Sequence, residues 1–150
     1  MRTIATLLGL TTALAAPAST QSVVVVQPLA FGVVMAGVAS TVPFTDPVKA
    51  ARVMLVGGAN QRVRLLFTLP ANLTGPGAPM PLVFGPGSAG YATVNNPAAA
   101  APFNPRNPAN RRLSNPGGQG WVFLGGTVLP PAGQTPGVYS NVVILTVLFL

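Results

Sequence analysis

Hydrophobic residues along the chain occur in short runs that are bounded by proline, glycine and asparagine. Proline and glycine each occur 17 times in the 150 residues, which leaves little room for a long helix. The runs themselves are rich in valine, leucine, isoleucine, phenylalanine and threonine, a composition typical of strands. After an apolar N-terminal segment, the pattern therefore predicts an all-β domain.

Strands are predicted where such runs are long enough, and turns where the breakers gather. The expected strands cover residues 23–26, 29–35, 41–45, 51–56, 61–69, 80–85, 90–94, 121–129 and 138–150. Residues 57–60 (Gly-Gly-Ala-Asn) are expected to form a hairpin connection, and the glycines at 125–126 a bulge or a close backbone approach. Residues 95–120 are rich in proline, asparagine and glycine. We expect a long loop there, with short extended pieces at 101–103 and 112–114.

Residues 61–69 show the clearest alternation of hydrophobic and polar positions. Val63, Leu65 and Phe67 fall on one face, and Arg62 and Arg64 fall on the other. A period of two with apolar residues on one side indicates a half-buried strand. We expect the two arginines to face solvent, as charged side chains on an exposed sheet face do. A ligand-binding role for them is the alternative.

The C-terminal run is apolar on both faces of the strand that it predicts. Its two faces carry, respectively, Val142, Ile144 and Leu148, and Val143, Leu145, Val147 and Phe149. Such a strand is expected in the centre of a sheet or in contact with another molecule. A bare apolar edge promotes aggregation, so it requires a partner strand.

The N-terminus has the order of regions that is typical of a secretory signal peptide. A basic start that includes Arg2 precedes an apolar run at residues 4–16, and small residues follow. Cleavage is expected after Ala15 or Ala18, and we favour Ala18, which removes residues 1–18. A membrane anchor is the alternative, but the run is shorter than the ~20 apolar residues of a bilayer span.

The remaining residues, 19–150, suffice for a single domain with a modest core. No later run is long enough to span a membrane once the proline and glycine breaks are considered. The chain has no cysteine, so an exported domain of this sequence must be stable without disulfides. That favours a sandwich with a real hydrophobic core.

The residue types that perform chemistry are scarce. The chain has no histidine, no cysteine and one acidic residue, Asp46. General acid–base catalysis and nucleophile activation draw mostly on these types, and metal sites draw on clusters of them. We therefore expect neither an enzyme nor a metal or cofactor site, and predict a function that depends on shape and surface.

The formal net charge is +7, although only 6% of the residues are charged. No basic stripe is interleaved with aromatic residues, so we do not expect a nucleic-acid partner. Arg106, Arg111 and Arg112 all fall within the predicted loop. They are the candidate anion-binding residues, with an acidic cell-surface polymer as the partner.

Three segments follow an order that is known from exported proteins. Residues 29–34 (Leu-Ala-Phe-Gly-Val-Val) form an L-x-F-G strand, residues 121–129 carry Gly-Gly within a strand, and residues 137–140 (Gly-Val-Tyr-Ser) form a G-x-Y-S turn. Residues 103–105 (Phe-Asn-Pro) add an Asn-Pro loop. Together they resemble a family of secreted bacterial proteins of unknown function that look like fimbrial subunits.

The resemblance implies an immunoglobulin-like, pilin-like β-sandwich of about seven to nine strands. It also implies a location at the cell surface, reached through the periplasm, and leaves open a periplasmic chaperone as a partner. Tyr139 is expected either to bond back to a backbone carbonyl, as a tyrosine at a sandwich corner does, or to lie half-buried on an edge. Trp121 is expected to be a core residue.

Two functions are consistent with these features. The first is a structural subunit of an extracellular filament, fimbria or surface matrix, built by β-strand donation between copies. Its candidate inter-subunit residues are Val23, Val24, Val25 and Val26 as donor, with Val142, Ile144 and Leu148 on the acceptor strand. The second is a secreted monomeric adhesion module that holds an anionic polymer through Arg106, Arg111 and Arg112.

Overall fold

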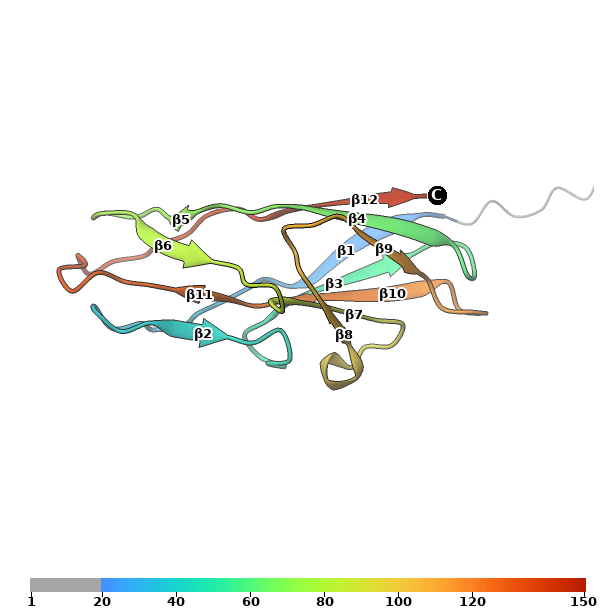
Figure 1. Ribbon diagram of the computed structural model, residues 1–150, viewed down its shortest axis with the longest axis horizontal. Coiled ribbons are helices and arrows are strands. Elements are labelled where there is room, and N and C mark those ends of the chain that lie inside the picture. Colours follow the sequence, from blue (N-terminus) through green and yellow to red (C-terminus); the bar gives the residue numbers. More distant parts are fainter. Residues whose placement is uncertain (1–19) are drawn as a thin grey trace, which may run out of the picture.

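The computed structural model describes residues 20–150, which form strands and one short 3-10 helix (Figure 1). The predicted signal peptide, residues 1–18, lies outside the described residues. The all-β prediction is confirmed, because residues 20–150 contain no α-helix. In that part of the chain, accordingly, no helix has the length and apolarity to cross a membrane.

The strands form three antiparallel sheets. The five-stranded sheet has the order β1 (Ser22–Gln27), β3 (Ala51–Val56), β10 (Gln119–Leu124), β7 (Ala89–Ala92) and β8 (Ala101–Phe103). The four-stranded sheet has the order β2 (Ser40–Val42), β11 (Gly126–Val128), β6 (Met80–Val83) and β5 (Asn72–Leu73). The three-stranded sheet has the order β12 (Ile144–Phe149), β4 (Arg62–Thr68) and β9 (Ala109–Arg112). The 3-10 helix η1 (Pro97–Ala99) precedes β8.

The first core lies between the five-stranded and three-stranded sheets. Leu55 of β3 and Val122 of β10 pack in one cluster with Val63 and Leu65 of β4. Tyr91 of β7 donates a hydrogen bond of 2.8 Å from its hydroxyl to the carbonyl of Arg112 in β9. The two sheets therefore face each other as the layers of a sandwich, and the alternation in β4 has the predicted direction.

The second core lies under the four-stranded sheet. Met80 and Leu82 of β6 and Val128 of β11 are buried there. Phe67 and Phe103 contact both cores, and their ring centroids are 6.3 Å apart. The hydrophobic interior is therefore continuous along the molecule.

Gly125 lies where the chain passes from β10 in one sheet to β11 in another. A Cβ atom at this position would collide with the backbone of residues 42–44, including the carbonyl oxygen of Val42. The expected close backbone approach at 125–126 is confirmed, and it explains why glycine is present.

Residues 57–60 do not connect a hairpin, contrary to prediction. β3 and β4 belong to different sheets, because Leu55 and Val63 must face each other across the core. Residues 29–35 form no strand either. Pro28 removes a backbone donor, Gly32 has a φ of +71°, and Leu29, Phe31 and Val34 pack over the second core.

Three further expectations need correction. Within residues 95–120, the extended piece expected at 101–103 is confirmed as β8, but the piece expected at 112–114 is β9, at Ala109–Arg112, and η1 and the start of β10 also replace the expected loop. The last strand begins at Ile144, because before it only Ser140 forms a bridge, to Thr74. Trp121 is half-buried on the outer face of its sheet, opposite Met54, since its neighbour Val122 takes the inward position.

Candidate assembly and anion-binding surfaces

β1 is an edge strand whose valines are largely exposed. In the described part of the chain it pairs with β3 alone, and Val23 to Val26 have exposed fractions of 42% to 68%. The register places Val23 opposite Leu55 and Val25 opposite Val53, so these two valines point to the core side of the sheet. Although they point to the core side, Val23 and Val25 are 43% and 68% exposed, so the opposite layer does not cover them fully. The four valines thus belong to the protein's own sheet in this structure.

β12 is the edge strand of the opposite layer. Among residues 20–150 it pairs with β4 alone, and Ile144 and Leu148 on its outer face are 52% and 45% exposed. The backbone N–H of Leu150 donates to the carbonyl of Arg62 at 2.9 Å. Because backbone groups alternate in direction along an antiparallel strand, Leu145 and Val147 direct their N–H and C=O groups to the free edge.

Val142, the third predicted acceptor residue, lies just before β12 and is exposed. Of the two expectations for the C-terminal strand, a sheet centre is wrong for the single chain, since within residues 20–150 β12 has a strand on one side only, and a contact with another molecule stays a prediction. One of its faces is exposed and the other packs on the core. Its unpaired edge therefore remains available for a partner strand.

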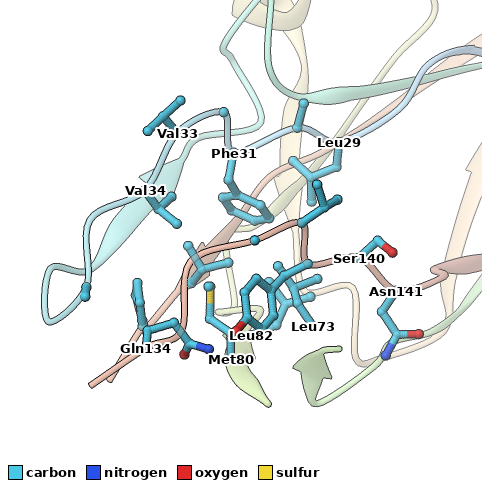
Figure 2. A pocket seen from close by; sticks show the side chains of 18 of the residues that line it. Leu29, Phe31, Val33, Val34, Leu73, Met80, Leu82, Gln134, Ser140 and Asn141 are labelled. Carbon is cyan, nitrogen blue, oxygen red and sulfur yellow. The ribbon is translucent and has the colours of Figure 1, made fainter. Parts of the chain in front are cut away.

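An apolar cavity of about 710 Å³ lies between the chain that leaves β1 and the chain that enters β12. Figure 2 shows Leu29 and Phe31 on one side of it, with Leu82 and Met80 on the other. Tyr139 lines the same space. On this side of the second core, the chain forms irregular segments rather than paired strands. The cover over the second core is therefore less closely packed than the sheet that covers the first core.

The hydroxyl of Tyr139 is engaged by the backbone. It donates to the carbonyl of Thr135 at 2.8 Å and accepts from the N–H of Gly77 at 3.0 Å. The expectation that this tyrosine bonds back to a backbone carbonyl is confirmed. Both hydrogen bonds stabilise the turn before the final segment. The hydroxyl thus uses its donor and an acceptor position in contacts within the protein.

The structure does not bring the three predicted anion-binding arginines together as one site. The Nε of Arg106 donates to the carbonyl of Phe84 at 3.0 Å. The guanidinium of Arg111 lies over the ring of Phe103, with 4.9 Å between its Cζ and the ring centroid. Both side chains therefore have structural contacts. Arg112 donates to the carbonyl of Asn60 at 3.2 Å and lies on an exposed strand.

Two of the predicted arginines, Arg111 and Arg112, instead share a hollow on the three-stranded sheet with Arg62 and Arg64. Arg62 of β4 is directly opposite Arg112 of β9, and Arg64 is directly opposite Asn110. With Arg111 and Leu150, these residues line a shallow hollow of about 670 Å³. Arg62 and Arg64 are exposed, as predicted. Their proximity to Arg112 was not predicted, because the pairing of β4 with β9 has no signal in the sequence.

The acidic side chain of the protein, Asp46, is engaged elsewhere. Its carboxylate accepts hydrogen bonds from the N–H groups of Val48 at 2.8 Å and Lys49 at 2.9 Å. These two backbone hydrogen bonds hold the pKa of Asp46 below its usual value. Asp46 therefore stabilises a turn and is not among the residues that line the arginine hollow.

No family model matches this chain, and neither a curated protein nor a solved structure matches it. The function is therefore inferred from the surfaces of the molecule itself.

Proposed function

We propose that this protein is an exported structural subunit of an extracellular filament or surface matrix, with a pilin-like, immunoglobulin-like sandwich. Copies join by β-strand addition. The observation that carries the proposal is the free edge of β12, a six-residue strand paired on one side only. Its unpaired backbone groups and exposed Ile144 and Leu148 form a template for another strand.

β1 supplies a suitable partner for that edge. It also pairs on one side only, and its run of four valines has high β-propensity. If β1 of one copy adds to β12 of the next, the contact joins two different surfaces. A head-to-tail contact of this kind generates an open fibre unless its rotation closes a ring.

Strand addition differs from strand donation in what happens to β1. In donation, Val23–Val26 would leave their partner β3 and pair in the next copy. β1 is hydrogen-bonded to β3 in the single chain, and leaving it would break that ladder. Addition at the free edge leaves every existing ladder intact, so we favour it.

The composition supports a structural function. A single acidic residue and no histidine or cysteine give little material for acid–base or nucleophilic catalysis.

The test is electron microscopy and light scattering of residues 19–150 over a range of concentration and time. We expect regular filaments for the wild type and their loss in Ile144→Lys/Leu148→Lys, because lysines on an edge strand oppose pairing. Val48→Lys/Val94→Lys is the matched control, since both valines are exposed outside the two edge strands.

Uniform monomers at every concentration, or a closed dimer as the largest species, would contradict the filament proposal. Filaments that form equally well from Ile144→Lys/Leu148→Lys would show that β12 is not the contact. Unchanged melting temperatures are required of both double variants, so that loss of assembly is not a consequence of unfolding.

A further inference from the structure

We infer that the arginine hollow on the outer face of the three-stranded sheet binds an acidic polysaccharide. The hollow is lined by Arg62 and Arg64 from β4 and by Asn110, Arg111 and Arg112 from β9, together with Leu150. Its volume of about 670 Å³ is within the range of ligand sites. The hollow adjoins β12, because Leu148 is the cross-strand partner of Arg64, but its arginines come from β4 and β9 rather than from the free edge. The inference does not depend on self-assembly.

The charges in the hollow lack compensation from acidic side chains. Arg62 and Arg112 are directly opposite each other on paired strands, an arrangement that is unfavourable for like charges. No acidic residue lines the hollow, and the chain's one acidic side chain, Asp46, accepts hydrogen bonds in a turn. An anion from outside the protein would relieve the repulsion.

Guanidinium groups specify the chemistry of that anion. Their planar array of donors matches the oxygens of carboxylate and sulfate groups, often with two parallel hydrogen bonds. Arg62 and Arg64 are two positions apart on one face of β4, which separates their Cα atoms by about 7 Å. The Cβ atoms of Arg112 and Arg62, which are directly opposite on paired strands, are about 5 Å apart. Three cationic groups at such spacings suit a ligand with several separate anionic groups.

The other lining residues favour a polysaccharide over alternative polyanions. The side-chain amide of Asn110 can both donate to and accept from sugar hydroxyls. No aromatic residue lines the hollow, so it lacks the stacking platform that single-stranded nucleic acids require. The arginines line a depression, which an extended polymer enters more readily than a flat bilayer surface does.

The test measures binding of polygalacturonate, with uncharged dextran as the negative control, to monomeric residues 19–150 isolated by size exclusion. We expect salt-dependent binding of polygalacturonate and none of dextran. Arg62→Gln/Arg64→Gln should weaken binding about tenfold, the combined effect of two exposed charge pairs. Lys49→Gln/Arg52→Gln removes the same charge outside the hollow and should change the affinity about twofold or less.

Three results would overturn the inference. The first is an equal loss of affinity in the two double variants, which would indicate attraction to net charge only. The second is unchanged binding in Arg62→Gln/Arg64→Gln. The third is binding to phosphatidylglycerol vesicles with the expected variant dependence but no binding to polygalacturonate, which would identify a lipid surface instead. Failure to form filaments has no bearing on these outcomes, because binding is measured on monomers.

Discussion

Tyr91 shows how one buried polar group links the two layers. Its side chain is 6% exposed, and its hydroxyl donates to the carbonyl of Arg112 at 2.8 Å. Burial raises the pKa of Tyr91 to about 12, while the nearby charge of Arg111 acts in the opposite direction. The folded protein therefore retains the phenolic proton at pH values where the unfolded chain releases it.

This shift predicts a loss of stability at alkaline pH. Because the pKa of Tyr91 rises from 10.0 to about 12 on folding, its contribution is complete below pH 10.0 and is lost as the pH rises toward 12. Denaturant titrations at several pH values measure the free energy of unfolding. Tyr91→Phe should cost about 1–2 kcal/mol at neutral pH, through the unpaired carbonyl of Arg112.

Above pH 10.0, the curve of Tyr91→Phe should decline less steeply than that of the wild type. Lys49 and Tyr139 are present in both proteins. The difference between the two curves of unfolding free energy against pH therefore gives the contribution of Tyr91. Parallel curves for the two proteins would contradict the predicted effect of burial.

At the scale of the elements, the most constrained position is the junction of β10 and β11. The two strands form one stretch of chain interrupted at Gly125, and each pairs in a different sheet. The missing side chain lets the backbone of residues 42–44 approach the junction directly. This junction connects the strands that contribute to both cores.

We therefore expect Gly125→Ala to destabilise the fold by about 3 kcal/mol, since the added Cβ would force backbone rather than a flexible side chain to move. Gly133→Ala is the matched control, because a Cβ there meets no atom within 4 Å. Its effect should be about 0.5 kcal/mol or less. Thermal unfolding followed by circular dichroism compares the two. Similar melting temperatures would show that the junction can relax.

At the scale of the whole molecule, the decisive feature is the unequal size of the facing layers. Three strands, β12, β4 and β9, face a sheet of five. β1 is the edge of the larger sheet, and its core-facing valines, Val23 and Val25, are left exposed. A strand added at the free edge of β12 would extend the smaller, three-stranded layer by one strand.

A cysteine pair distinguishes addition from donation. Val24 is the cross-strand partner of Met54, and the protein has no cysteine of its own. In Val24→Cys/Met54→Cys, oxidised after assembly, addition predicts disulfides within each chain. Thiol titration of dissolved assemblies should then find no free cysteine. Free thiols, left when β1 pairs with β12 of the next copy, or a ladder of covalent multimers on a non-reducing gel, formed when β1 pairs with β3 of the next copy, would contradict addition.

Much of the local structure could be predicted from residue patterns. The predicted strand at 51–56 corresponds to β3, and the alternation at 61–69 correctly predicts that Val63 and Leu65 are buried while Arg62 and Arg64 are exposed. These predictions succeed because period-two patterning and backbone breakers act within a few residues. The Gly-Gly sequence at 125–126 likewise indicated a close backbone approach.

The surfaces were less predictable, because they depend on strands that are far apart in the chain. The sequence suggested Arg106, Arg111 and Arg112 as one group because they are close in number. Instead, the β4–β9 pairing places Arg112 beside Arg62, while Arg106 bonds to Phe84. Register between distant strands is set by side-chain packing in the core, which local patterns do not specify.

The sequence by itself determined the fold class and the orientation of individual strands, since proline, glycine and alternating hydrophobic residues act locally on the backbone. It also determined that the chain has too few acidic, histidine and cysteine side chains for chemistry that requires several of them. Only the tertiary structure decided that β1 and β12 are edges and that Arg62, Arg64 and Arg112 share a hollow. The reason is physical: edges and clusters arise when distant segments pack around a common core.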